Sequence, residues 1–379
     1  MTQEVFIVEA LRTPIGRRDG ALRDTHPVDL AAHILASLVA RVGIDAAHIE
    51  DVALGCVTQI GEQGGNVARL AVLQAGFPIE VPAFSMNRMC GSSQQALHSV
   101  AQAIAAGDMD LAIAGGVESM TRVQLGSDWS PAVAPANFPY ELLHQGISAE
   151  LIAERWKLTR DELDDFGYTS QTRAAAATRA GHFAREIVPV PRQNDSFSVD
   201  EGIRFEPDRA KMSTLKPAFK PDGVVTAASS SQISDGAAAI LLASGRALER
   251  YNLKPRARIL ARVAVGSDPV IMLTGPIPAT FKALERTGLR IEDIDLFEIN
   301  EAFASVVLAW QRETGAALDR VNVNGGAIAL GHPLGASGAR LMCTLLAELE
   351  RRGGRYGLQT MCIGHGMGTA TIIERVGER

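Results

Sequence analysis

The chain has 379 residues, 46% hydrophobic and only 5% aromatic, so it is long enough to form two or three packed units with large cores. Its formal net charge of -6 disfavours nucleic acid as the main partner, because a protein that follows phosphates presents a basic surface. The four cysteines, Cys56, Cys90, Cys343 and Cys362, lack CxxC spacing and follow no secretory signal, which argues against a disulfide framework or a metal site.

Short apolar strand candidates alternate with Ala-rich helical stretches from the start of the chain. We expect strands at residues 4–8 and 51–57, and helices at 28–40 and 67–75. This alternation predicts an α/β protein with buried parallel or mixed strands. No apolar run reaches the roughly 18 residues that span a bilayer. The chain begins with a strand rather than an export or transit signal, so we expect a cytoplasmic protein with no membrane partner.

Two distant segments have the same layout. Residues 83–116 contain an apolar stretch, a turn of small residues, a helix and a strand that ends in glycines, and residues 322–364 follow the same order. The first turn carries Cys90 and the second carries His332. The simplest explanation is a duplicated unit whose two copies face each other, each directing a reactive side chain from its turn. Chance similarity of two ordinary βαβ units is the alternative.

Regularity falls between the two segments, where Pro, Asp, Ser and Arg accumulate and indicate an inserted lid. One helix in the lid is well marked, because Thr159 and Glu162 have capping-box spacing and an Ala-rich run stops at Gly181. The expected domains are residues 1–118 with 232–250 as the first half, 119–231 as the lid, and 251–379 as the second half.

Four polar or thiol side chains stand at turns where chemistry is plausible. Cys90 precedes a helix, and a helix N-terminus lowers a thiol pKa and favours a nucleophile, although a lone cysteine is more often a small buried residue. His332, held between Gly331 and Pro333, is a candidate base, with a core histidine as the alternative. Cys362 ends a strand before a run of glycines whose N–H groups can bind an oxyanion. Asn300 follows an apolar strand and can hold a water or an oxyanion, or simply begin a helix.

These residues lie in motifs that closely resemble the thiolase family, in order and over essentially the whole chain. The motifs are Cys90-Gly91-Ser92-Ser93, Asn300-Glu301-Ala302-Phe303, Gly331-His332-Pro333-Leu334-Gly335 and Cys362-Ile363-Gly364. The resemblance implies an α/β thiolase fold of two duplicated βαβαβαββ halves in a five-layered α-β-α-β-α arrangement with an inserted lid. Residues 58–69 and 266–280 are most similar to bacterial degradative 3-ketoacyl-CoA thiolases, including those for steroid-derived or other cyclic acyl chains.

The resemblance also implies the catalytic roles. Cys90 is expected to carry the acyl group, His332 to activate it, and Cys362 to act as acid or base at the carbon next to the thioester. Asn300, through a water, and His332 are expected to form one oxyanion site, and the amides of Cys90 and Gly364 the other. The reaction needs no permanently bound cofactor and no metal, with coenzyme A as co-substrate.

Contacts to coenzyme A and the acyl chain follow from weaker matches. Arg204, Ser231 and His144 match family positions near the adenine and the pantetheine arm, although a solvated arginine and ordinary turn capping are alternatives. Gln145 and Phe303 are expected in the substrate pocket. Short-chain biosynthetic members commonly have Met where this chain has Gln145, which leaves the acyl length open. His365 replaces a usual glycine and either faces the site or points away.

Three functions remain to be separated at this stage. The first is a thiolase acting on acyl-CoA substrates, either in cleavage or in the reverse condensation, as a homodimer or homotetramer. The second is a fatty-acid or polyketide type condensing enzyme, which uses two histidines beside the cysteine where this chain offers Cys362 and Asn300. The third is a non-catalytic acyl-CoA binding or scaffold protein with the same fold.

Overall fold

One mixed β-sheet runs through the computed structural model, which describes residues 3–130, 133–193 and 195–377. Its strands follow the order β10-β11-β12-β9-β1-β8-β5-β3-β4, and β2 (Gly16–Arg17) pairs with β8. The first set of strands is β1 (Val5–Arg12), β3 (Val52–Gly55), β4 (Ala83–Met86), β5 (Leu111–Ser119) and β8 (Ser234–Ser244). The second set is β9 (Ala257–Gly266), β10 (Leu296–Ile299), β11 (Tyr356–Ile363) and β12 (Met367–Arg375).

The two sets have the same topology. In the first, β3 lies parallel to β4 and β5, and β5, β8 and β1 follow as antiparallel neighbours. In the second, β10 lies parallel to β11 and to a bridge at Val321, and β11, β12 and β9 follow as antiparallel neighbours. The predicted duplication is therefore confirmed at the level of strand order and direction.

The two sets meet at β1 and β9. Phe6 pairs with Arg258 and Ile7 pairs with Ala257, so the strands of both halves form one continuous hydrogen-bonded path. The two β-layers of the expected five-layered arrangement are thus joined along this short seam.

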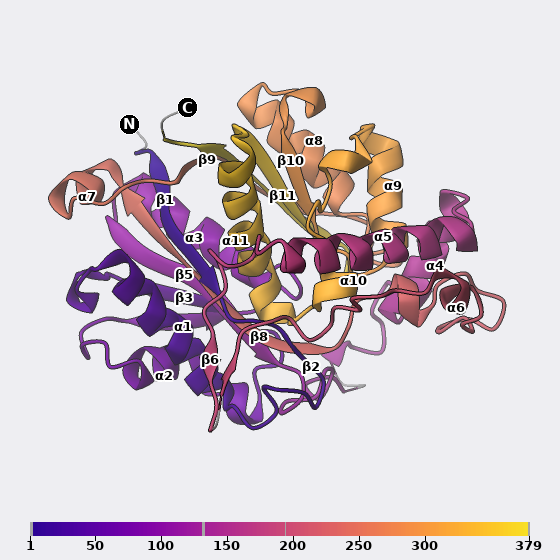
Figure 1. The fold of residues 1–379 in the computed structure, drawn as a ribbon, viewed down its shortest axis with the longest axis horizontal. Coiled ribbons are helices and arrows are strands. Elements are labelled where there is room, and N and C mark those ends of the chain that lie inside the picture. Colours follow the sequence, from indigo (N-terminus) through magenta and orange to yellow (C-terminus); the bar gives the residue numbers. More distant parts are fainter. Residues whose placement is uncertain (1–2, 131–132, 194, 378–379) are drawn as a thin grey trace.

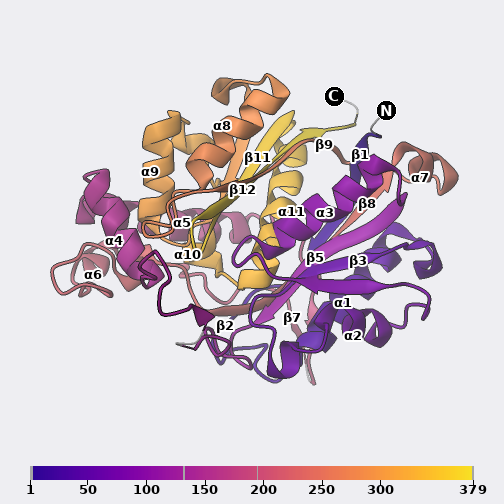
Figure 2. The ribbon, with the colours of Figure 1, turned by 180° about the vertical axis from the view of Figure 1, so that it is seen from behind.

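Helices cover both faces of each set and give the predicted five layers (Figures 1 and 2). The outer helices are α1 (Pro27–Val42) and α2 (Val67–Gln74) on the first half, and α8 (Pro276–Thr287) and α9 (Ala304–Thr314) on the second. The central layer is α3 (Ser92–Ala106) and α11 (Leu334–Arg352), whose apolar side chains share one core with strands of both halves. Each fully buried leucine there stabilises the fold by about 1.5–3 kcal/mol.

Small residues let the central helices approach other backbone closely. Residues 334–349 of α11 are all buried, as expected for a helix packed on every side. A Cβ added at Gly338 would lie 2.5 Å from the backbone nitrogen of Gln94 in α3, and one at Gly116 would lie 2.1 Å from the carbonyl of Gly335. Larger side chains at these two positions would push apart the turns that carry Cys90 and His332.

The lid leaves the sheet after β5 and returns at β8, which are antiparallel neighbours. Its elements are α4 (Gln145–Arg155), α5 (Arg160–Arg179), β6 (Val190–Pro191), β7 (Ser196–Phe197) and α6 (Arg209–Ser213). The predicted capping box of α5 is present, with Thr159 and Glu162 each bonding the other's backbone N–H. The remaining helices are α7 (Gly245–Arg250) and α10 (Ala327–Leu330). Within the described ranges, none of the helices has the length and hydropathy to cross a membrane.

A buried ionic cluster fastens the lid to β1. The guanidinium of Arg12, fully buried, donates to Glu186 Oε1 at 2.6 Å and to both carboxylate oxygens of Asp200 at 2.8 and 3.0 Å. Asp200 also accepts from the backbone N–H of Ile15 at 2.7 Å. The charges are therefore paired and hydrogen-bonded, which a buried ion pair requires.

Candidate active site

Cys90 lies in a tight turn between β4 and α3. Met89 adopts a left-handed conformation with φ of 46°, which is uncommon for a residue with a Cβ. The turn is closed by hydrogen bonds from Gly91 N to Arg88 O at 3.0 Å and from Ser92 N to Met89 O at 3.0 Å. Helix α3 starts at Ser92 with Gly91 as its N-cap, so Cys90 precedes the helix by one residue more than the motif predicted.

The prediction that this position lowers the thiol pKa was wrong. Burial raises the pKa of Cys90 to about 12, the neighbouring Cys362 adds to this, and the N–H groups of Gly364 and Cys90 itself lower it. The thiol is 1% exposed and belongs to an apolar cluster, so desolvation of a thiolate outweighs the two nearby N–H groups. The buried members of this cluster besides Cys90 are Val57, Met120, Leu334, Leu341, Met361 and Ile363.

Cys362 lies at the end of β11 and is fully buried. Its thiol donates to the carbonyl of Asn300 at 3.9 Å, and Asn300 Nδ2 donates back to the sulfur at 3.7 Å. Burial raises the pKa of Cys362 to about 11, although the Asn300 contact lowers it. Both thiols are therefore protonated at neutral pH, and a base is needed to form a thiolate.

His332 is set up as that base. Ser337 gives its hydroxyl proton to the carbonyl of Pro333 at 2.8 Å, so its oxygen accepts from Nδ1 of His332 at 2.6 Å. This places the ring proton on Nδ1 and leaves the lone pair on Nε2. Burial, with a smaller contribution from Arg340, lowers the pKa of His332 to about 3, so the imidazole is neutral.

Asn300 connects the imidazole to the second thiol. Its Nδ2 lies 3.3 Å from His332 Nε2 as well as within reach of Cys362. Its Oδ1 is buried and has no hydrogen-bond partner within the described part of the chain. Over the same ranges, no hydrogen bond joins Cys90 to His332 directly. The structure thus brings Cys90, Cys362, Gly364, Asn300 and His332 to one place from four separate loops.

Two buried carboxylates, to which the sequence motifs assigned no role, hold these segments together. Glu118, at the end of β5, accepts from the N–H groups of Val57 and Thr58 at 2.9 and 3.1 Å, and from that of Gly335 at 2.8 Å. It therefore ties the loop after β3 to the start of α11. In the sequence, the presence of Glu118 at the end of an otherwise apolar and small-residue strand could have indicated this anchoring role.

Glu301 has the same function beside Asn300. It accepts from the Ser170 hydroxyl at 2.7 Å, from Asn322 Nδ2 at 2.8 Å and from the Ile328 N–H at 3.2 Å. The acidic residue of the Asn300-Glu301 motif is thus an anchor that joins the lid helix α5 to the loop before His332.

The residues matched to the pantetheine arm lie on one side of the site. His144 caps α4, and its exposed ring lies 5.4 Å from that of Phe219, which packs edge-on against Phe303 at 5.7 Å. Ser231 is half-buried, and its N–H donates to the carbonyl of Ala302, next to Phe303.

Arg204 lies elsewhere on the lid, with an exposed side chain and a backbone N–H bonded to Gln171 of α5. Gln145, the first residue of α4, reaches Gly364: a Cβ built there would lie 3.1 Å from Gln145 Nε2. His365 follows with φ of 64°, and its ring lies 5.6 Å from that of Trp129. Cys56 and Cys343 are buried free thiols. Among the described residues, no group of His, Cys, Asp or Glu is arranged to hold a metal.

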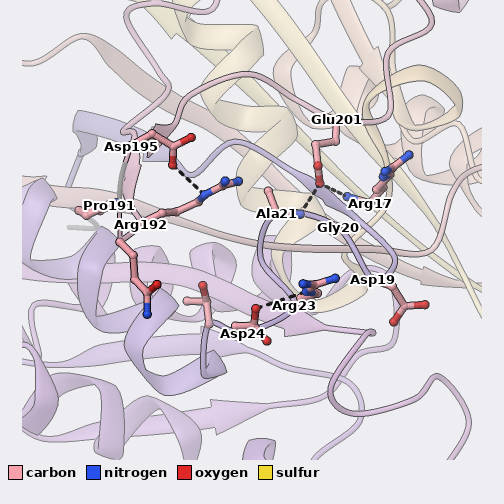
Figure 3. Close-up of a pocket in the computed structure, with 12 residues that line it drawn as sticks. Arg17, Asp19, Gly20, Ala21, Arg23, Asp24, Pro191, Arg192, Asp195 and Glu201 are labelled. Carbon is pink, nitrogen blue, oxygen red and sulfur yellow. Dashed lines mark hydrogen bonds and ion pairs between the residues drawn. The ribbon is translucent and has the colours of Figure 1, made fainter.

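A surface pocket of about 970 Å³ is distinct from this site (Figure 3). Several of its charged groups pair with protein partners, as in Arg192 with Asp195 at 2.9 Å and Arg23 with Asp24 at 3.3 Å. Glu201 in the same pocket accepts from the backbone of Arg17 and Ala21. None of the predicted site residues lines it.

Comparison with known proteins agrees with the fold and these motifs. Residues 5–246 match the family model for the thiolase N-terminal domain, and residues 253–375 match that for the thiolase C-terminal domain. The chain is 52% identical to a steroid 3-ketoacyl-CoA thiolase of Mycobacterium tuberculosis, over 98% of this chain and 94% of that protein. It is 48% identical to a 3-ketoacyl-CoA thiolase of Erwinia tasmaniensis, over 99% of this chain and all of that protein.

A crystal structure of the acetyl-CoA acetyltransferase of Bacillus anthracis superposes with a TM-score of 0.92 at 37% identity, covering 99% of both chains. The duplicated α/β fold with its two buried thiols is that of an acyltransferase of the thiolase class. The chain belongs to the thiolase family.

Proposed function

We propose that the protein cleaves 3-oxoacyl-CoA with coenzyme A, giving acetyl-CoA or propionyl-CoA and a shortened acyl-CoA, through an acyl group carried on Cys90. The observation that supports this most is the convergence of two thiols, one neutral imidazole and a backbone amide in a single buried site. The reverse Claisen condensation uses the same groups.

In the cleavage direction Cys90 passes its proton to His332 Nε2 as its sulfur attacks the ketone carbon, because burial disfavours a separate thiolate and imidazolium. This transfer requires the sulfur and Nε2 to come within hydrogen-bond reach in the substrate complex. The carbon–carbon bond then breaks, and the departing enolate takes the proton of Cys362. The incoming CoA thiol returns a proton to Cys362 as it attacks the acyl group, and Cys90 recovers its proton from His332.

Two oxyanion sites match the two points where negative charge develops. The N–H groups of Gly364 and Cys90, which lower the pKa of the Cys90 thiol, are the donors for the acyl oxygen. His332 and Asn300 serve the enolate oxygen, and the unpartnered Oδ1 of Asn300 suits a water that in turn donates to that oxygen. Losing one such donor costs roughly 3 kcal/mol in the transition state.

The approach of coenzyme A is proposed along the lid. His144 and Ser231 flank the wall formed by Phe219 and Phe303, which suits the pantetheine arm, and exposed Arg204 suits the adenine nucleotide. Gln145 and Phe303 face the acyl pocket. The division into residues 1–118 with 232–250, 119–231 and 251–379 stays a prediction.

A degradative role is favoured over a biosynthetic acetoacetyl-CoA thiolase. The two relatives named 3-ketoacyl-CoA thiolases are 52% and 48% identical, compared with 37% for the acetyl-CoA acetyltransferase. The presence of a polar Gln145 at the acyl pocket argues in the same direction.

A homodimer or homotetramer is also proposed. β4 ends the sheet, and exposed apolar side chains gather on it and on the neighbouring helix α2 and loop, namely Leu70, Leu73, Ile79 and Phe84. An unpaired apolar edge strand of this kind invites a second copy. A monomeric mass in light scattering at micromolar concentration would refute this. Four free cysteines support a cytoplasmic location.

The experiment that tests the proposed function is mass spectrometry of the protein mixed with acyl-CoA. A thioester-labile acyl adduct on Cys90, absent from Cys90→Ser together with CoA-dependent cleavage, is the expected result. Tight acyl-CoA binding without an adduct would instead indicate a non-catalytic binding protein. Acceptance of carrier-protein thioesters in place of CoA esters would indicate a condensing enzyme.

A further inference from the structure

The side-chain amide of Gln145 lies beside the Gly364 turn and has no polar partner among the described residues. Gln145 is half-buried at the start of α4, and its Nε2 would lie 3.1 Å from a Cβ at Gly364. Within the described ranges, its side chain makes no hydrogen bond. Gly364 lies near Cys90, because its N–H lowers the pKa of that thiol, so the side-chain amide of Gln145 is close to the acyl group that Cys90 would carry.

A second polar side chain lies on the same turn. His365 is half-buried, and its ring faces Trp129 at a centroid distance of 5.6 Å and an interplanar angle of 47°. Over the described part of the chain its ring nitrogens make no hydrogen bond. Its φ of 64° is one that glycine adopts without strain, so the imidazole is present here at a conformational cost.

The remaining surroundings of Cys90 are apolar and adaptable. The cluster around the thiol contains four methionines, Met89, Met120, Met361 and Met367. Unbranched methionine side chains adjust to ligands of different shape. A plain alkyl chain would fit against them, but it would remove water from Gln145 and His365 without giving either a partner. Binding that leaves a polar group buried and unpaired is penalised, and a substrate that supplies the missing hydrogen bond is selected.

We infer that the acyl group carries, beyond its 3-oxo group, a second oxygen that accepts hydrogen bonds, either a ketone or a carboxylate, and that Gln145 and His365 recognise it. The inference rests on the proposed function. Gln145 offers an N–H donor from the lid and His365 offers one from the β11–β12 turn, on either side of Gly364. Trp129 supplies a flat apolar surface beside the imidazole.

The test compares kcat/KM for three kinds of CoA ester: 3-oxodecanoyl-CoA, the same ester with a second ketone at successive chain carbons, and 3-oxoacyl-CoA esters that end in a carboxylate. The protein is expected to prefer one oxygenated series by about tenfold or more over the alkyl ester. The ketone and carboxylate series distinguish the two sources of the acceptor oxygen.

Two variants test whether Gln145 and His365 cause the preference for an oxygenated ester. Gln145→Met keeps the side-chain length and removes the amide, and His365→Gly relaxes the backbone while removing the ring. Each is expected to reduce the preference about tenfold, mainly by lowering kcat/KM for the oxygenated ester. Gln311→Met is the matched control, because this half-buried glutamine of α9 bonds the carbonyl of Ala316, and it should leave the preference unchanged.

Three outcomes would be decisive against the inference or its basis. Equal kcat/KM for all esters in the unaltered protein would overturn it while leaving the thiolase function intact. An equal fall in kcat for every ester in Gln145→Met would overturn it too, since the amide would then serve the thioester carbonyl. Absence of both cleavage and a Cys90 adduct with every ester would instead reject the proposed function.

Discussion

The hydroxyl of Ser337 lies 2.6 Å from Nδ1 of His332 and holds the ring proton on that nitrogen. We predict that Ser337→Ala lowers kcat about three- to tenfold, the value of one neutral hydrogen bond, because the ring loses the partner that holds its proton on Nδ1. Single-turnover acylation of Cys90 should slow by the same factor. Ser305→Ala, which removes another buried hydroxyl bonded to a backbone carbonyl, is the control and should keep kcat.

Cys362→Ala is expected to separate the two halves of the reaction. Cys362 also protonates the departing CoA when acetyl-CoA acylates Cys90, but a thiolate is a far weaker base than an enolate and needs this proton less, so acetyl transfer to Cys90 should slow much less than cleavage. Cleavage of the carbon–carbon bond should fall by about 10²-fold or more, because the enolate loses its proton donor. Adduct mass and thiolysis rate, measured on the same sample, check this. Loss of both activities together would mean that Cys362 is needed to form the Cys90 thiolate.

Arg12→Met should destabilise the fold by about 3–5 kcal/mol, because it leaves the carboxylates of Glu186 and Asp200 buried without their partner. Denaturant unfolding with a fixed protein concentration measures the effect. Arg23→Met removes an exposed pair with Asp24 and should change stability by about 0–1 kcal/mol. Equal effects of the two variants would contradict the role given to the buried cluster.

Acid should weaken the fold through its buried histidines. Burial, together with nearby arginines, lowers the pKa of His98 to about 3 from 6.5, and that of His332 is lowered similarly. A depressed folded-state pKa gives stability that is full above 6.5 and is lost as the pH falls towards 3. His98→Gln should therefore lose less stability between neutral pH and about pH 5 than the unaltered chain. An unchanged loss would show that other groups dominate.

Much of the fold could be predicted because local signals and overall topology agree. The capping box at Thr159 is a short-range feature that the structure confirms. The strand of the second unit, β11, ends directly before Gly364 as predicted, but the predicted glycine end of the first unit was wrong, because β5 continues through Gly115 and Gly116 to Ser119. The order of the strands follows from the repeat. The seam at Phe6 and Ile7 could not be foreseen, because strand pairing between the halves depends on how the central helices set their distance.

The candidate site was predictable in its residues but not in its electrostatics. The turn around Cys90 pointed to a helix N-terminus, yet the pKa depends on the apolar groups that the second half places around it. The partners of Glu118 come from segments up to 217 positions away, and no spacing in the sequence reveals them. Gln145 was expected in the pocket from a motif, whereas its position against Gly364 required the fold.

Among the described residues, the strands of the two halves pair with each other only along the short seam between β1 and β9, and the active site takes residues from both halves. One half contributes Cys90 and the other contributes Asn300, His332 and Cys362, so the alignment of the reactive groups depends on how α3 and α11 pack against each other. A small shift of α3 along α11 would move the Cys90 thiol away from the His332 imidazole without unfolding either half. Substitutions of the small residues between these two helices should therefore change the distance between the thiol and the imidazole, although these residues lie outside the pocket.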